Sequence, residues 1–285
     1  EPECFRQVRA LLDYIPHYYG DELVQAAKYH FDEKKKAKHI ETILPENTRK
    51  GYDIREVIND VTDDDSFFET SAEFAINCVT GFAKIEGRSV GIVANNPGGM
   101  GGVLDCDASD KIARHVRYCD AFNIPLVTFV DVPGFIPGPQ EEQKGIIRHG
   151  AKVIYAYSEA SVPKISVITR KAYGGAYIAM CSKHIGADFV YAWPASEIAV
   201  MGAEGAVGIL YAKELADPEK AAEVAAKEQA YREEIMTPAI AAKRGYVTEV
   251  IEPSATRRHI AESLSFLADK KSMDNPLKKH GNIPL

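Results

Sequence analysis

Short apolar runs that alternate with longer helical patterns constrain the fold of this chain more than any other feature. The candidate strands are mostly continuous apolar stretches, as expected for strands buried on both faces, and cover residues 89–94, 125–131, 164–169, 189–192, 197–201 and 246–251. The helical patterns cover residues 108–122, where Asp107 is placed to cap the first amides, and residues 142–159, 174–184, 216–235 and 256–270. This alternation predicts an α/β domain whose parallel strands are joined by crossover helices.

The first fifty residues differ in character from the rest. Residues 1–15 have the apolar spacing of an amphipathic helix with Pro2 in its first turn, and Pro16 ends it. The stretch that follows has a basic run at residues 34–38, which favours a solvated connector with an exposed lysine face over a binding patch. We therefore expect an N-terminal helix and interdomain connector over residues 1–50 and one domain over residues 51–285. Because the chain starts at Glu1 rather than Met, we also expect it to be a piece of a longer protein that lacks its N-terminal part.

Composition narrows the class of partner. The formal net charge of −7 provides no basic surface for a phosphate backbone, so nucleic acid is not an expected partner. No apolar run approaches the roughly 20 residues that cross a bilayer, and the N-terminus lacks the features of a signal peptide, so we expect a cytoplasmic protein. The cysteines form no C-x-x-C pair, which favours reduced packing residues and predicts no metal site; they are Cys4, Cys78, Cys106, Cys119 and Cys181.

Two glycine-rich loops follow predicted strands. Residues 95–102 contain four glycines and either let a ligand approach the backbone or form a tight turn without a ligand. Residues 133–138 follow the strand that ends in Asp131, at the kind of strand end beyond which ligands bind in open α/β folds; a stiff connection without a ligand fits equally well. Asp131 could orient a donor, although an aspartate at a strand end more often caps the loop that follows it.

A third segment, residues 169–177, runs from a strand straight into a helix through Gly174, Gly175 and Ala176. A helix N-terminus offers unpaired amides to an anionic oxygen, and small residues let that oxygen reach them, which is the chemistry of an oxyanion hole. An ordinary strand-to-helix turn would also favour glycine.

Side-chain nucleophiles are not apparent in the sequence. It contains no Gly-x-Ser-x-Gly, no His-Glu-x-x-His and no cysteine with an obvious paired histidine. A mechanism that uses backbone amides therefore suits the chain better. His149 could act as an acid or base, but a lone histidine is more often a packed or capping residue.

Taken in order, these segments resemble the C-terminal domain of the biotin-dependent acyl-CoA carboxyltransferase family, from about Leu44 to the end. The matching motifs are YDIREV (52–57), DCDASDK (105–111), CDAFNIP (119–125), VDVPGFIPG (130–138), GIIRHGAK (145–152), RKAYGGAY (170–177), AWP (192–194), IAVMGAEGA (198–206) and HGNIPL (280–285).

The resemblance implies an α/β, crotonase-like (ClpP/crotonase) superhelix of ββα units and a biotin-binding site. Gly175 and Ala176 match the positions whose amides face the ureido oxygen of carboxybiotin, and Ile178 matches a position that faces the acyl group. The remaining expected biotin-binding residues are Pro133, Gly134, Phe135, Tyr173 and Gly174.

The implied activity is the movement of a carboxyl group between carboxybiotin, carried on a partner protein, and an acyl-CoA such as propionyl-CoA or acetyl-CoA. The implied partners are an N-terminal acyl-CoA-binding half of the same subunit, a biotin carboxyl carrier protein and a biotin carboxylase subunit, in a homo-oligomer. One alternative is the α subunit of a biotin-dependent malonyl-, methylmalonyl- or glutaconyl-CoA decarboxylase with membrane subunits, or a transcarboxylase. A crotonase-type hydratase or isomerase would need a pair of carboxylates over the thioester, and no well-placed pair is found. The alternative from another class is a non-catalytic scaffold domain.

Overall fold

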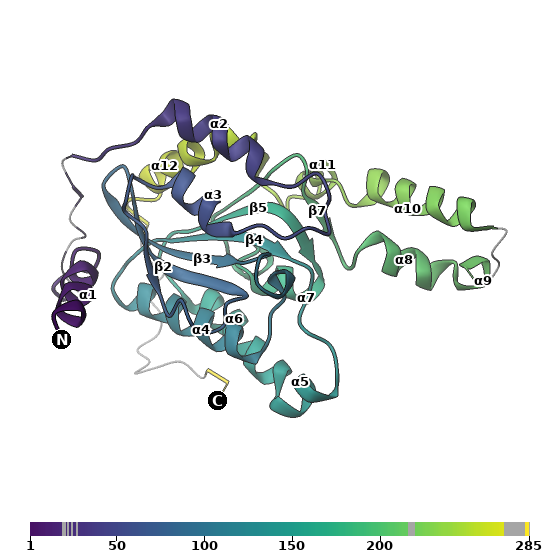
Figure 1. Ribbon diagram of the computed structural model, residues 1–285, viewed down its shortest axis with the longest axis horizontal. Helices are drawn as coiled ribbons and strands as arrows, with labels where there is room; N and C mark the ends of the chain where they lie inside the picture. Colours follow the sequence, from purple (N-terminus) through teal and green to yellow (C-terminus); the bar gives the residue numbers. More distant parts are fainter. Residues whose placement is uncertain are drawn as a thin grey trace.

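An eight-stranded mixed sheet forms the centre of the computed structural model, which describes residues 1–18, 21, 23, 25–26, 28–215, 220–270 and 283–284 (Figure 1). The sheet order is β1-β2-β3-β4-β5-β6-β8, and β7 pairs with β5 off this path. The strands β3 to β6 and β8 are parallel, while β1 and β2 add an antiparallel hairpin edge. The predicted α/β architecture is confirmed. The strands are β1 (Phe68–Thr70), β2 (Cys78–Ile85), β3 (Arg88–Asn95), β4 (Leu126–Val132), β5 (Lys164–Tyr173), β6 (Phe189–Ala192), β7 (Glu197–Ala199) and β8 (Glu249–Val250).

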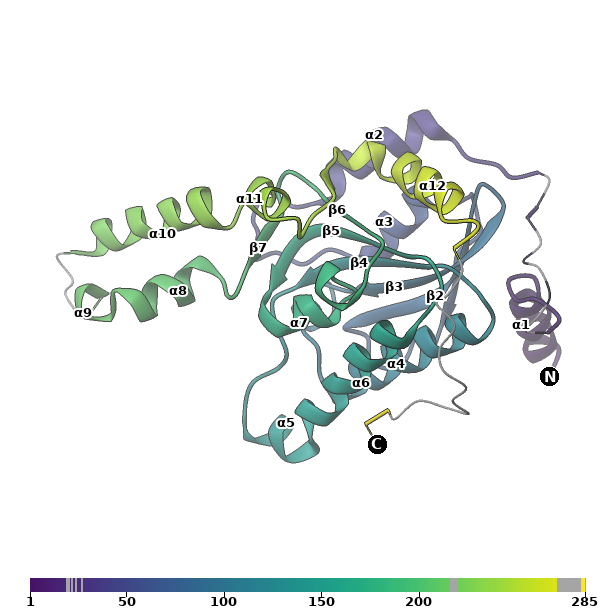
Figure 2. The same cartoon turned by 180° about the vertical axis from the view of Figure 1, so that it is seen from behind.

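Helices cover both faces of this sheet (Figures 1 and 2). One apolar core lies between the sheet and α4, α6 and α7, and a second core lies between the sheet and α3 and α12. The buried indole of Trp193 donates to the Thr256 hydroxyl at 2.9 Å and so fixes the start of α12. The helices are α1 (Pro2–Leu12), α2 (Glu33–Ile43), α3 (Ile54–Val61), α4 (Cys106–Ala121), α5 (Pro139–Lys144), α6 (Ile146–Glu159), α7 (Gly174–Ala179), α8 (Ala203–Leu210), α9 (Ala212–Leu215), α10 (Ala221–Ile235), α11 (Pro238–Lys243) and α12 (Thr256–Phe266).

Several predicted elements differ from the observed ones. The helix predicted over residues 142–159 is two helices, because Gly145 adopts a left-handed conformation with φ of 91° that ends α5 and starts α6. The helix predicted to run to residue 184 ends at Ala179, and the amide of Ala108 is capped by Asp105 rather than by Asp107. The predicted start of the 216–235 helix at residues 216–219, and residues 280–282 and 285 of the C-terminal motif, lie outside the described residues.

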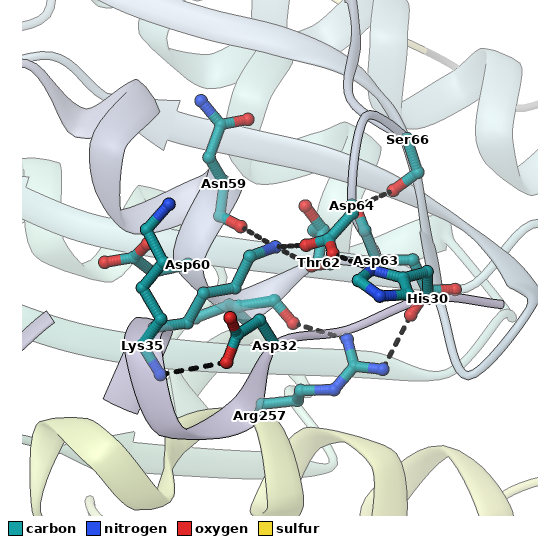
Figure 3. A network of polar contacts seen from close by, with 12 residues as sticks. His30, Asp32, Lys35, Asn59, Asp60, Thr62, Asp63, Asp64, Ser66 and Arg257 are labelled. Atoms are coloured by element: carbon teal, nitrogen blue, oxygen red, sulfur yellow. Dashed lines mark hydrogen bonds and ion pairs between the residues drawn. The ribbon is translucent and has the colours of Figure 1, made fainter. Parts of the chain in front are cut away.

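The expected connector contains a helix, α2, that is mostly exposed but is tied to the domain at several points. Asp32 caps α2, whose Ile40 is buried in the second core. Arg257 of α12 lies 3.8 Å from the centre of the Phe31 ring. Its guanidinium also donates to Asp63 at 2.6 Å (Figure 3). Lys36 donates to two backbone carbonyls at the end of α3 and pairs with Asp64, although the other lysines of the run are exposed, as expected. The division of the chain at residue 50 remains a prediction.

Two further expectations concern the cysteines and membrane-spanning helices. All five cysteines are free thiols. Cys78, Cys106, Cys119 and Cys181 are buried, as predicted for packing residues, whereas Cys4 is exposed and does not fit that prediction. Within the part of the chain that the structure describes, no helix is both long enough and apolar enough to cross a membrane.

Candidate active site

The three loops singled out in the sequence leave the sheet at one edge. They follow β3, β4 and β5, which are neighbouring parallel strands, so their carboxyl ends lie together. Val132 at the end of β4 pairs with Ala172 near the end of β5, and α7 contacts β4. The strand order therefore places residues 133–135 and 173–176 at the same edge of the sheet.

The first two loops are locked to each other by their backbones. The amide of Leu104 donates to the Gly134 carbonyl at 3.0 Å, and the amide of Ile136 donates to the Leu104 carbonyl at 2.8 Å. A Cβ atom on Gly102 would lie 2.6 Å from the Asp131 carbonyl oxygen, which no side chain tolerates. Gly102 therefore allows close backbone packing, which favours a tight turn without a ligand at this position of the 95–102 loop.

A buried ion pair lies beneath this edge. The Arg170 Nε donates to Asp131 Oδ2 at 2.9 Å, and Asp131 Oδ1 accepts from the Lys171 amide at 3.1 Å. The Arg170 guanidinium also donates to the Lys50 carbonyl at 2.9 Å and stacks 5.0 Å from the centre of the Tyr52 ring. Burial raises the pKa of Asp131, and the charge of Arg170 opposes this effect. Asp131 therefore anchors β5 to β4 by orienting donors of β5. It does not cap the loop that follows it, which is the more common role of an aspartate at a strand end.

The turn into α7 offers backbone donors without a competing cap. Its N-cap residue, Tyr173, makes no side-chain hydrogen bond to the first amides. Gly174 has a φ of +58°, Gly175 is exposed with nothing within 4 Å of an added Cβ, and Ala176 is buried. Because α7 has only six residues, its dipole is small, and the amides themselves would have to supply the stabilisation of an anion.

The other expected site residues lie around this turn. Phe135 packs its ring over Gly150 of α6, where an added Cβ would lie 2.9 Å from it. Ile178 and Phe135 are both partly buried against the first core. Gly134 is open to approach, with nothing within 4 Å of an added Cβ. The candidate site is an exposed turn, whereas two cavities of about 790 and 520 Å³ lie elsewhere, beside α12 and beside α4.

One polar network at the site was not foreseen in the sequence. The Tyr173 hydroxyl donates to Glu197 of β7, and burial raises the pKa of Tyr173 above its ordinary value. The other carboxylate oxygen of Glu197 lies 3.8 Å from Nε of Arg232 on α10. Tyr173 and Glu197 are far apart in the sequence, so only the pairing of β5 with β7 could have indicated their contact.

His149 has the contacts of a packed residue. Its Nδ1 lies 2.8 Å from Asp110 Oδ1, which also pairs with Lys152 at 2.9 Å. These contacts join α6 to α4, on the face of the sheet that carries the first core.

Comparisons with known proteins agree with this geometry. A family model described as "Carboxyl transferase domain" matches residues 1–283. A propionyl-CoA carboxylase beta chain from Cereibacter sphaeroides is 48% identical over 99% of this chain and 54% of its own length. A methylmalonyl-CoA decarboxylase subunit alpha from Veillonella parvula is 50% identical over 100% of this chain and 54% of its own length.

A solved structure of a transcarboxylase 12S hexamer with hydrolysed methylmalonyl-coenzyme A bound superimposes with a TM-score of 0.90 at 49% identity, covering 98% of this chain and 54% of that one. The expected crotonase-like fold is thereby confirmed. The chain spans about half the length of the relatives that it matches.

Proposed function

This chain belongs to the carboxyl transferase domain family, and we propose that it forms the biotin-facing half of a site that moves a carboxyl group between carboxybiotin and an acyl-CoA. The observation that carries the proposal is the uncapped turn at Gly175 and Ala176, which is open to solvent at the end of a buried strand.

Backbone amides suit the charge that develops in this reaction. When carboxybiotin gives up CO₂, negative charge falls on its ureido oxygen. Fixed donors aimed at developing charge are worth most when they need no reorganisation. In our proposal the amides of Gly175 and Ala176 supply these donors. The absence of a side chain on Gly175 lets the oxygen come within hydrogen-bond distance.

The residues around the turn would hold the two substrates. Pro133, Gly134 and Phe135 are fixed by Leu104 at the same edge of the sheet and would line the biotin side. Tyr173 and Gly174 would shape the entrance to the amides. Ile178, partly buried in the same short helix, would face the acyl group.

The acyl-CoA itself would be held by the other half of the protein. The chain spans 54% of the relatives' length, and the names of those relatives refer to propionyl-CoA and methylmalonyl-CoA. We propose propionyl-CoA or acetyl-CoA as acceptor. A biotin carboxyl carrier protein and a biotin carboxylase subunit would be the partners of a homo-oligomer in the cytoplasm.

Decarboxylation is the second candidate, because identity to a decarboxylase subunit alpha is as high as identity to the carboxylase chain. A transcarboxylase is a variant of this second candidate. The same amides would serve both directions, since the charged form of biotin is common to them.

The test is a carboxyl-transfer assay of the full-length protein, or of this chain mixed with its N-terminal half, with free biotin and a panel of thioesters. Biotin-dependent decarboxylation of malonyl- or methylmalonyl-CoA, or carboxylation of propionyl-CoA by carboxybiotin, is the expected result. Decarboxylation that needs a membrane partner would favour the second candidate. Normal folding and assembly without transfer to or from any thioester would overturn the proposal in favour of a scaffold.

A further inference from the structure

The helices α8 and α10 project from the sheet (Figures 1 and 2). We call them, with α9, the arm. Ala203 at the start of α8 and Met236 just after α10 pack with Tyr173 in a small apolar cluster. The base of the arm is therefore built on the residue that immediately precedes the turn at 174–176.

The backbone at the base of the arm also lies against this turn. A Cβ atom on Gly174 would lie 2.8 Å from the Val200 carbonyl oxygen, and one on Gly202 would lie 3.4 Å from the Tyr173 ring. Residues 200–202 thus contact Tyr173 and Gly174 directly. If the Tyr173 ring shifts, we expect Gly174 and Gly202, which contact it or its backbone, to shift as well.

Glu197 provides the polar contact that fixes the ring. The Tyr173 side chain is buried, and a buried hydroxyl needs a hydrogen-bond partner, which is the Glu197 carboxylate. Glu197 pairs in register with Lys171 on β5, two residues before Tyr173, so its side chain lies on the same face of the sheet as the tyrosine. On its other side Glu197 faces Arg232, which also lies 4.0 Å from Glu204 of α8. The carboxylate thus joins the strand, the turn and the arm.

We propose that Glu197 is a positioning residue, which holds Tyr173 and thereby fixes the amides of Gly175 and Ala176 in the orientation that an anionic oxygen requires. The proposal deepens the function proposed above and rests on it for its kinetic consequence. Glu197 contacts no reacting atom in this role. Its effect passes through the tyrosine ring, and Arg232 keeps its carboxylate aimed at that ring.

The kinetic test compares four variants of the full-length protein. Glu197→Ala and Tyr173→Phe each remove the hydrogen bond and are expected to lower kcat for transfer with free biotin by about tenfold, less than the loss of a direct oxyanion donor. KM for the acyl-CoA stays unchanged, because in our proposal the CoA part of the thioester is held by the other half of the protein. Glu197→Gln keeps an acceptor for Tyr173 and retains most of the activity. Glu223→Gln, on the same arm but in an ion pair with Lys227 of α10, is the matched control.

The double variant Glu197→Ala/Tyr173→Phe is expected to lose no more than either single variant, since both remove one interaction. Equal losses in Glu197→Ala and Glu197→Gln would show that charge at Glu197, and not its hold on Tyr173, sets the rate, and would overturn the proposal.

Hydrogen exchange gives a readout that does not depend on turnover. The amide of Met180 donates to the Ala176 carbonyl at 3.0 Å and so reports on the turn. This amide is expected to exchange about tenfold faster in Glu197→Ala and Tyr173→Phe, because the turn opens locally. The amides of residues 165–168 and the Glu223→Gln control stay at the rate of the unsubstituted protein. Unchanged exchange at the Met180 amide would overturn the role of Glu197. If the unsubstituted protein transfers no carboxyl group, the proposed function fails, and the exchange rates alone decide the role of Glu197.

Discussion

Gly174 and Gly175 are adjacent, yet they lack a side chain for different reasons. Gly174 has a φ of +58° and the Val200 carbonyl within 2.8 Å of an added Cβ, so the fold itself requires glycine there. Gly175 has no such constraint, and nothing in the described chain lies within 4 Å of an added Cβ. Space that the protein leaves open at a turn is available to a ligand.

Gly175→Val should therefore separate function from folding. We expect the melting temperature to stay close to that of the unsubstituted protein, because the new side chain meets no protein atom. Carboxyl transfer should fall by about 10²- to 10³-fold, the loss typical of one oxyanion donor. Gly174→Ala is the matched control and should lower the free energy of unfolding by about 1–3 kcal/mol through backbone strain. A folded Gly175→Val enzyme with an unchanged rate would remove this turn from the mechanism.

Ile178 should influence the choice of acyl chain. Ile178→Asp places a charge where an apolar group is expected to face the acyl tail, so the ratio of kcat/KM for propionyl-CoA to that for acetyl-CoA should fall by about tenfold. The ratio is the measurement to use, because Ile178 packs partly against the core and the substitution also lowers the amount of folded enzyme. Ile178→Val keeps an apolar side chain and should leave the ratio unchanged. If the ratio is the same in all three proteins, the residue lies away from the acyl group.

At the residue scale, the sequence indicated the residues of the candidate turn better than it indicated the residues that hold the turn in place. The segment 173–176 was predicted from its glycines and its position after a strand. The Asp131–Arg170 pair and the Tyr173–Glu197 contact were not, because each joins residues on different strands. Such contacts depend on strand order and register, which local patterns do not encode.

The helix α2 shows how a polar element can be part of the domain. Its sequence is rich in lysine, and only Ile40 is fully buried, so its pattern resembled a linker. Its attachment is electrostatic and local: Lys36 donates to the carbonyls of Asn59 and Thr62 and pairs with Asp64.

The attachment of α2 should weaken in acid. The hydrogen bond from Lys36 lowers the pKa of Asp64 below its ordinary 3.8. A lowered folded-state pKa means that the ionised carboxylate stabilises the fold above pH 3.8 and that this contribution is lost as the pH falls below it. Asp64→Asn should cost about 0.5–1 kcal/mol in urea unfolding at pH 7 and progressively less as the pH falls below 3.8. Glu73→Gln, at an exposed carboxylate away from α2, should show no such difference. A cost that stays the same as the pH falls would contradict this account.

The elements that the sequence did not indicate share a physical cause. β1 and β2 form an edge hairpin whose central Gly81 allows the β1 backbone to approach to 2.4 Å of an added Cβ. Glycine and the polar residues Thr80 and Lys84 interrupt the apolar run that marked the buried strands. The interior parallel strands β3 to β6 were predicted because burial on both faces leaves a continuous apolar signal.

At the scale of the whole molecule, the chain supplies the turn that we propose for biotin, and it spans about half the length of its relatives. Its arm carries exposed apolar side chains, Ile209 at 69% and Leu210 at 64% exposure, with Val200 at 76% near its base. Exposed apolar patches of this kind are typical of surfaces that meet another protein.

The chain alone should neither bind acyl-CoA at micromolar strength nor carboxylate it, because the thioester site is expected in the other half. Titration calorimetry with propionyl-CoA measures this directly, and the full-length protein is the positive control. Sedimentation of the isolated chain should show self-association, since an obligate interface buries more than about 2,000 Å² and part of it would be uncovered. Micromolar acyl-CoA binding with turnover in the presence of biotin would overturn the half-site assignment.

The pair of Arg170 and Asp131 also has a consequence for the order in which the protein folds. Arg170 bonds to Asp131 and to the carbonyl of Lys50, which lie 39 and 120 positions away along the chain. Closing such long loops costs entropy before the contact repays it. An arginine that is buried without its carboxylate is strongly destabilising. The contacts of Arg170 should therefore form late in folding, after β4, β5 and the segment before α3 have come together. The edge of the sheet that carries the candidate site would then be complete only once most of the core has formed.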